Sequence, residues 1–305
     1  MDNLGFIFHW GLYSVPAFDD ISSARRRKLQ NGSEWYLRRL QEDGKYRPIS
    51  GWKETQEFND GKNYEDFADD FFQVENPKEI IDSWMKLAND VGASYVILTA
   101  QHHDGWKLWK NHPIDLVQLF KDSALEHDLR FGIYYSWFTF GKTCTIKYMR
   151  ENVIPDIEDL KKYEPDIWFF DGDWEIKTQA AVKIVDNICR DLKGEINDRI
   201  GHKNLKEDLN YLGFSTYRTY GDREIPKTKP KVPWESIQTI GISWGRNTQQ
   251  EKQDYKTGEE VLKIYNEIVS KGGKLLLNLG PDKDGKLDKF EVKALRSFAK
   301  LRQEA

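Results

Sequence analysis

Short apolar runs separated by longer amphipathic stretches dominate this 305-residue sequence. The clearest runs are residues 5–10, 94–100, 130–136, 166–171 and 274–280, and a weaker one lies at 194–198. Apolar runs of this length that alternate with helical patterns are typical of parallel strands covered by helices. The alternation therefore predicts an α/β fold. At this length we expect one (β/α)8-like TIM barrel, regular or irregular, as a single domain over residues 1–305.

Two of the amphipathic stretches have well-marked ends. In the first, Asn76 can cap a helix, Pro77 suits its first turn and Gly92 can end it. In the second, Thr257 and Glu260 have the spacing of a capping box. An apolar run follows each stretch within a few residues, so both patterns predict a helix that leads into a buried strand.

The charge pattern argues against several classes of partner. The formal net charge is −4, and lysines and acids are interspersed along the chain, so no basic surface for nucleic acid or anionic lipid is predicted. No apolar stretch has the length of a membrane span, and the amino terminus lacks the basic start and cleavage site of a signal peptide. We therefore expect no nucleic-acid or membrane partner and a cytoplasmic location, with a trimmed secreted form as the alternative. The oligomeric state stays open.

Two residue types in the composition bear on function. Cys144 and Cys189 are the only cysteines, and their separation suits neither a disulfide framework nor a zinc ribbon, so two buried thiols are expected. Aromatic residues make up 13% of the chain, including eleven Trp. Flat rings stack on the apolar faces of sugars, but a large aromatic core explains most of these residues equally well.

The stretch WFFDGDWE, residues 168–175, shows how a strand can lead into a site. Its aromatic residues suit a buried strand, and Asp171 follows them directly. Because the active site of a parallel barrel is built at the carboxyl ends of its strands, Asp171 is predicted to emerge there, with Gly172 permitting a sharp exit. A helix cap or a turn is the structural alternative for such a carboxylate.

Polar residues follow other predicted strands in the same way. They are His9 and Trp10, then His102, His103 and Asp104, then Tyr134 and Tyr135, and then Asn197, Asp198 and Arg199. The two adjacent histidines point to opposite faces of a strand, which disfavours a mononuclear metal site that uses both. Contacts to sugar hydroxyls fit better, and Arg199 is a suitable donor to them. Glycoside hydrolysis requires two carboxyl groups; the pattern predicts Asp171 as one and leaves its partner open.

Seven stretches, in order along the chain, carry a family resemblance. They are GFIFHWGLYSVPAF (5–18), EWYLRRL (34–40), GASYVILTAQHHDGWKLW (92–109), PDIWFFDGDWE (165–175), INDR (196–199), WESIQTIGISWG (234–245) and IVSKGGKLLLNLGPDKDG (268–285). They span nearly the whole chain, and such an ordered series is far more specific than any one stretch. The sequence resembles the α-L-fucosidases of glycoside hydrolase family twenty-nine.

The resemblance implies a function and a set of site residues. It implies a retaining exo-hydrolase that removes terminal α-linked L-fucose from glycans or glycosides through a covalent fucosyl-enzyme intermediate, without a metal or other cofactor. Asp171 would be the nucleophile and Trp244 an aromatic wall near the methyl group of the sugar. The residues that would line the fucose pocket are His9, Glu34, Trp35, His102, His103, Tyr135 and Arg199.

The acid/base is carried over with less support. Some members of the family use a Glu at the position where this chain has Arg218, so the acid cannot lie there. Others use the Glu of a Trp-Glu pair, which is Glu235 here. We therefore expect Glu235 to be the acid/base, with Glu224 as the second choice.

Departures from the family pattern leave an alternative open. Phe169 stands where the family usually has Trp, Arg246 replaces a frequent Tyr, and a carboxyl-terminal β-sandwich domain is not expected. The alternative is a fucose-binding barrel with weak or no turnover. A metal-dependent amidohydrolase would need a His-x-His pair on the first strand, where the chain offers only His9.

Overall fold

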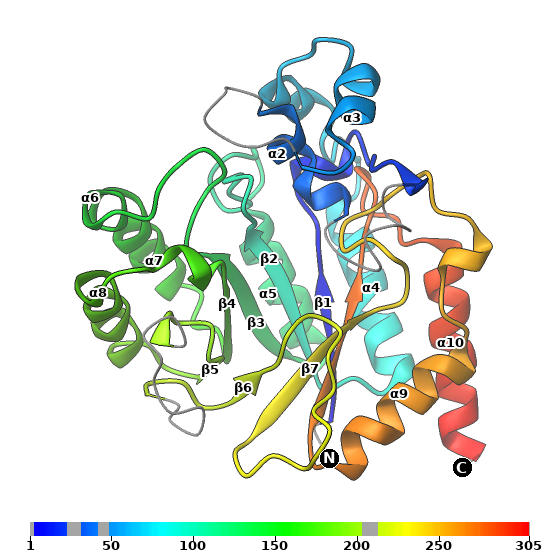
Figure 1. Ribbon diagram of the computed structural model, residues 1–305. Coiled ribbons are helices and arrows are strands. Elements are labelled where there is room, and N and C mark those ends of the chain that lie inside the picture. The colour runs from blue at the N-terminus through cyan, green and yellow to red at the C-terminus, as the bar shows by residue number, and fades with distance from the viewer. Residues whose placement is uncertain (1–2, 23–31, 42–48, 203–212, 305) are drawn as a thin grey trace.

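The computed structural model describes residues 3–22, 32–41, 49–202 and 213–304 (Figure 1). Eight parallel strands form one sheet in the order β5-β4-β3-β2-β1-β8-β7-β6. The strands are β1 (Leu4–Phe8), β2 (Tyr95–Gln101), β3 (Arg130–Ser136), β4 (Ile167–Asp171), β5 (Glu195–Ile196), β6 (Arg218–Thr219), β7 (Trp234–Thr239) and β8 (Lys274–Leu279). The predicted α/β fold is confirmed, as a TIM-like half-barrel. It is irregular because β5 and β6 are only two residues long and meet through a single parallel bridge between Asn197 and Tyr217.

Helices surround this sheet. The longer ones are α3 (Trp52–Asn59), α4 (Pro77–Val91), α5 (Leu116–Glu126), α7 (Ile154–Lys161), α8 (Gln179–Arg190), α9 (Gly258–Ser270) and α10 (Lys289–Glu304). The shorter helices and turns are η1 (Leu12–Ser14), η2 (Ser33–Trp35), α2 (Tyr36–Leu40), η3 (Tyr64–Asp70), α6 (Ile146–Tyr148), η4 (Met149–Val153), η5 (Asp173–Glu175) and η7 (Lys252–Asp254). Figure 1 shows α2 and α3 over the end of the sheet opposite to the two chain termini. None of the helices in the described part of the chain combines the length and apolarity needed to cross a membrane.

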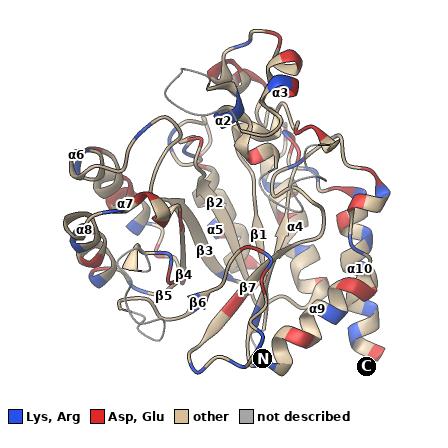
Figure 2. Ribbon diagram, viewed as in Figure 1, with Lys and Arg blue, Asp and Glu red and all other residues tan. Residues whose placement is uncertain are grey.

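The two helices predicted from end patterns are present. α4 begins at Pro77 and ends at Val91, and Gly92 after it has a left-handed φ of 78°, but the Asn76 side chain makes no capping hydrogen bond. α9 begins with the predicted capping box, in which Thr257 accepts from the Glu260 N–H and the Glu260 side chain accepts from the Thr257 N–H. Figure 2 shows acidic and basic residues interspersed along outer helices such as α8 and α10, whereas the strands carry few.

Side-chain alternation along the strands divides the core into two parts. The larger part packs between the sheet and the helices and includes Phe6, Phe8, Trp168 and Phe170. The smaller part fills the inside of the curled sheet, and its members are Ile7, Tyr95, Ile97, Tyr134, Ile167, Phe169, Ile237, Trp244 and Leu276. Successive residues of a strand point to opposite faces. A residue two positions beyond an inner apolar residue therefore points inward too.

Gly5 on β1 provides a test of the inner packing. A Cβ at this position would lie 2.1 Å from the ring of Tyr95, which is buried and bonded to Glu235. We expect Gly5→Ala to lower the free energy of unfolding by about 1–3 kcal/mol, because the ring has no free space to enter. Urea denaturation measures this loss. In the double variant with Tyr95→Leu the losses of unfolding free energy should compensate in part, because the smaller side chain leaves room for the added Cβ. If the two losses simply add, the Tyr95 ring is not what opposes the Cβ.

Candidate active site

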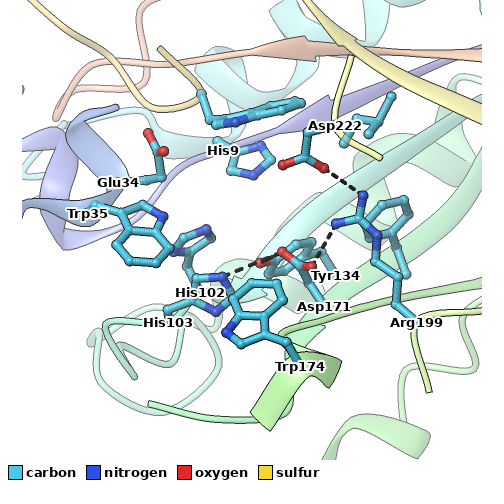
Figure 3. A pocket seen from close by; sticks show the side chains of 13 residues that line it. His9, Glu34, Trp35, His102, His103, Tyr134, Asp171, Trp174, Arg199 and Asp222 are labelled. Carbon is cyan, nitrogen blue, oxygen red and sulfur yellow. Dashed lines mark hydrogen bonds and ion pairs between the residues drawn. The ribbon is translucent and has the colours of Figure 1, made fainter. Parts of the chain in front are cut away.

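A pocket opens at the carboxyl ends of the strands (Figure 3). Its thirteen lining residues are His9, Glu34, Trp35, His102, His103, Tyr134, Phe169, Asp171, Trp174, Arg199, Asp222, Ile237 and Trp244. The structure thus brings together eight of the ten residues predicted for the site. The exceptions are Tyr135 and Glu235. Asp222, Tyr134 and Trp174 are additional members of the pocket.

Asp171 is the most strongly held carboxylate in the pocket. It ends β4, and Gly172 after it has a φ of 80°, a left-handed conformation that turns the chain sharply. Its Oδ1 accepts a hydrogen bond of 2.7 Å from Arg199, and its Oδ2 accepts one of 2.8 Å from the Tyr134 hydroxyl. His103 Nε2 lies 3.5 Å from Oδ2. Both carboxylate oxygens therefore point to fixed partners (Figure 3).

These partners set the charge of Asp171. Burial by itself would raise the pKa of this carboxyl, but the positive charge of Arg199, the field of His103 and the hydrogen bonds from Arg199 and Tyr134 together lower the pKa below its usual value of 3.8. Asp171 is consequently an anion at neutral pH. A buried anion aimed into a pocket can act as a nucleophile.

Arg199 links Asp171 to a second carboxylate, Asp222. One guanidinium nitrogen donates to Asp171, and the other donates to Asp222 Oδ1 at 2.6 Å and to the carbonyl of Tyr220 at 3.3 Å. The Asp222 side chain is 47% exposed, so it lies at the mouth of the pocket. Sequence reasoning missed Asp222 because the two-residue strand β6 before it was not recognised. Had that strand been predicted, the strand-end rule would have pointed to Asp222.

Glu34 is a third carboxylate of the pocket, with a different environment. Its side chain is buried on η2, and its two oxygens accept backbone hydrogen bonds from Gly32 at 2.6 Å and from Gly245 at 3.1 Å. Each oxygen keeps a second lone pair. Glu34 is thus arranged to accept hydroxyl protons from a ligand while it ties together two loops that are distant in sequence.

Asn278 on β8 sets the proton position on His9. Its Nδ2 donates to the carbonyl of Trp244 at 2.7 Å, and its Oδ1 lies 2.5 Å from His9 Nδ1. Because a carbonyl can only accept, the amide oxygen must face His9, and Nδ1 must carry the proton. Burial lowers the pKa of His9, which keeps the ring neutral. Its Nε2 is then free to accept a hydrogen bond from a hydroxyl in the pocket.

Aromatic rings form the walls between these polar groups. Trp244 lies 5.3 Å from the His9 ring between centroids, and the Arg223 guanidinium stacks on Trp244 at 4.3 Å. His102 stacks on Tyr134 with a centroid distance of 5.5 Å. Polar groups with fixed directions set among aromatic faces are typical of a sugar-binding pocket.

Tyr135 is a correction to the predicted site. Its hydroxyl donates to Asp156 at 3.2 Å, away from the pocket, and its neighbour Tyr134 lies in the pocket instead. The cause is strand alternation. Tyr134 belongs to the inner part of the core and Tyr135 to the outer part, and a shift of one residue moves a side chain to the opposite face.

Glu235 is a second correction. It pairs in register with Lys274, the first residue of β8, and accepts a hydrogen bond from Tyr95, the first residue of β2. Asp171 is the last residue of β4. Because all strands are parallel, Glu235 and Asp171 lie at opposite ends of the sheet. The alternative residue Glu224 is exposed and does not line the pocket either.

Comparison with known proteins agrees with this geometry. The family model for α-L-fucosidase matches residues 2–303. The chain belongs to the α-L-fucosidase family. It is 30% identical to the α-L-fucosidase of Branchiostoma floridae over 98% of this chain and 68% of that protein. It is 29% identical to the plasma α-L-fucosidase of Rattus norvegicus over 92% of this chain and 63% of the rat protein, so it spans less than two thirds of that relative.

Solved structures of the family share the fold. The Thermotoga maritima α-fucosidase superposes with a TM-score of 0.75 at 26% identity, over 99% of this chain and 72% of that one. A structure of the same enzyme in complex with fucose superposes with a TM-score of 0.74 at 26% identity, over 99% of this chain and 73% of that one. The α-L-fucosidase fold therefore accounts for the whole described chain, and the family is one of glycoside hydrolases.

The Glu235→Gln variant tests the placement of Glu235 through pH-dependent stability. Burial raises the pKa of Glu235 to about 7 from 4.5. Between these values the unfolded chain has lost a proton that the folded chain keeps, so the unfolding free energy falls as pH rises. We expect the parent to lose roughly 2–3 kcal/mol more than Glu235→Gln between pH 4 and pH 8, measured by urea denaturation. A hundredfold loss of hydrolysis in this variant would instead show that Glu235 belongs to the active site.

The Asn278→Asp variant tests the assigned His9 tautomer with little change of shape. A carboxylate beside Nδ1 stabilises the imidazolium and raises the pKa of His9. The imidazolium has no free acceptor, so fucose should bind roughly tenfold more weakly near pH 6 and recover affinity as rising pH deprotonates the ring. Calorimetric titration with fucose from pH 5 to 9 measures this. If the fucose affinity of the variant varied with pH no more than that of the parent, the tautomer assignment would be wrong.

Proposed function

We propose that this protein is a retaining exo-α-L-fucosidase that releases terminal α-linked L-fucose from glycosides or glycans. One observation carries the proposal most directly. Arg199 holds two carboxylates, Asp171 and Asp222, within hydrogen-bonding distance of a single guanidinium. A retaining glycosidase needs two carboxyl groups about 5 to 5.5 Å apart, and one guanidinium can bridge only carboxylates that lie close together.

In the first step of the proposed mechanism, Asp171 is the nucleophile. An ionised Asp171 oxygen attacks the anomeric carbon of fucose while the bond to the leaving oxygen breaks, and Asp222 donates a proton to that oxygen. The product is a fucosyl ester of Asp171. In the second step Asp222 takes a proton from water, the water oxygen attacks the anomeric carbon, and the ester breaks. Two inversions release fucose with its original configuration.

Asp222 is assigned as the acid/base by comparison of the three carboxylates in the pocket. Asp171 is held as the anion, and Glu34 is buried with both oxygens bonded to backbone N–H groups. Asp222 alone is exposed. The leaving group and the incoming water both pass through the mouth of the pocket, so a group that serves both steps must lie there.

Arg199 contacts both of the carboxyl groups that act in the two steps. In the free enzyme its guanidinium contacts both the Asp171 carboxylate and the Asp222 carboxyl group. Esterification removes the charge of Asp171, and the whole attraction of Arg199 then acts on Asp222. Arg199 therefore holds the Asp222 carboxyl group at the mouth of the pocket, where the second step requires it as a base.

The pocket is also suited to recognise fucose. His9 offers an acceptor, Glu34 offers free lone pairs, and Trp244 and Phe169 supply apolar walls for the methyl group. Among relatives, the T. maritima enzyme has been solved with fucose, and its fucosynthase form with a fucosyl disaccharide azide. A fucosylated oligosaccharide or glycoside is accordingly the proposed substrate.

Azide rescue distinguishes the two carboxylates by their products. Asp171→Gly leaves a small hole beside the anomeric carbon, so azide should replace the nucleophile and give a fucosyl azide of inverted configuration from an activated aryl fucoside. Asp222→Ala should still form the ester on Asp171 but hydrolyse it about 10²–10⁴-fold more slowly. Azide attack on that ester should then give the retained product, and NMR of the fucosyl azide identifies the configuration.

Matched variants control this experiment. Glu224→Ala should behave nearly like the parent. A retained azide product from Glu34→Ala or Glu224→Ala, and none from Asp222→Ala, would show that the acid/base assignment is wrong. A parent protein that binds fucose but hydrolyses no aryl fucoside would support the alternative of a fucose-binding barrel without turnover.

A further inference from the structure

The mouth of the pocket is marked by two residues. Of the thirteen lining residues, all within the described part of the chain, only Trp174 and Asp222 are exposed. The rest are buried or half-buried, so a sugar that fills the pocket can leave it only past these two. Trp174 and Asp222 are therefore the lining residues best placed to contact a group attached to the anomeric oxygen. Trp174 is the aromatic member of the pair.

One side of the Trp174 indole is occupied by protein. His103 and Phe138 stack on each other at 4.7 Å, and Trp174 meets both in edge-to-face geometry at 5.3 and 5.6 Å. Both contacts come from this one stacked pair, and Trp174 remains 41% exposed. Figure 3 shows the ring at the front of the pocket, beside His103 and in front of Asp171.

Other exposed aromatic residues in the described chain lie elsewhere and have stacking partners. Phe58 stacks on Phe18 with a centroid distance of 4.0 Å, and Arg190 lies 5.2 Å from the Phe214 ring. Neither lines the pocket. The open face of Trp174 is thus distinguished by its place at the mouth as well as by its exposure.

The backbone holds Trp174 in a fixed position. The turn η5 follows the left-handed Gly172, and the N–H groups of Glu175 and Ile176 donate to Gly172 and Asp173 at 3.2 and 2.9 Å. The fully buried Ile176 anchors the end of the turn. A rigid aromatic surface loses little entropy when a ligand binds, which favours its use as a contact surface.

We propose that Trp174 forms a binding subsite for the sugar next to fucose, with its open indole face against the apolar face of a neutral pyranose ring. The proposal rests on the function proposed above and adds the chemistry of the leaving group. Asp173 and Glu175 are the neighbours of Trp174 in the sequence, and Asp222 is the other exposed residue that lines the pocket. Arg199, the one Lys or Arg among the lining residues, is already paired with Asp171 and Asp222, and Lys177 is paired with Glu175. An acidic sugar would find no free cation in this set, so a neutral pyranose is preferred to a uronic acid.

The experiment compares substrates with and without a sugar at this subsite. α-L-Fucosyl fluoride has no sugar in its leaving group, whereas α-L-fucosyl galactoside presents a neutral pyranose. We expect Trp174→Ala to lower kcat/KM for the galactoside at least tenfold more than for the fluoride. Trp174→Phe, which keeps a flat ring, should restore most of the difference. Phe58→Ala, at an exposed aromatic residue away from the pocket, should change the two substrates equally.

Other outcomes overturn the proposal. Equal losses of kcat/KM on both substrates would show that Trp174 contacts fucose itself. No loss of kcat/KM on either substrate would show that Trp174 does not contribute to ligand binding. A fucosyl galacturonide that is hydrolysed as well as the galactoside would overturn the preference for neutral sugars.

A binding measurement separates this proposal from the proposed hydrolysis. If the parent releases no fluoride, the proposed function fails, but calorimetry still tests the subsite. The parent should bind the fucosyl galactoside more tightly than fucose, and Trp174→Ala should abolish most of that difference. Equal affinities of the parent for the two ligands would contradict the subsite whatever the turnover.

Discussion

The inner face of the curled parallel sheet accepts only every second side chain of each strand, and the site depends on this constraint. Ile7 packs in the inner core and His9, two residues later, lines the pocket. Phe169 and Asp171 repeat the same relation on β4. The apolar residues that fill the inside of the sheet thus also fix the direction of the polar residues above them. A well-packed inner core positions the nucleophile without a separate scaffold.

The two halves of the sheet contribute to the site in different ways. The strands β3 and β4 present Tyr134 and Asp171 from regular backbone, and His9 and His103 lie one and two residues beyond the ends of β1 and β2. Arg199 and Asp222 come from segments after the two-residue strands β5 and β6, where side chains replace the missing backbone ladder. Asn197 bonds to both the N–H and the carbonyl of Phe170, and Asp198 accepts from the Thr219 N–H. The stretch Asn197–Arg199 therefore links the segments around the short strands β5 and β6 and places the Arg199 guanidinium in the pocket.

Arg199 is the point where these halves meet. Its interaction with Asp171 crosses from β4 to the segment after β5, and its interaction with Asp222 reaches the segment after β6. A buried carboxylate without such a partner would have a raised pKa and lose its charge. Removing Arg199 would consequently affect the charge of the nucleophile, the position of the second carboxylate and the closure of the pocket together.

The sequence by itself determined the alternation of strands and helices, the α/β class, the position of Asp171 at a strand end and the ordered stretches shared with α-L-fucosidases. Local periodicity and turn residues suffice for these, because each depends on neighbours in the chain. Only the tertiary structure decided that Tyr134 rather than Tyr135 faces the pocket, that Glu235 lies at the far end of the sheet, and that Asp222 joins Asp171 on Arg199. These depend on strand register and on contacts between segments far apart in the chain, which local spacing does not encode.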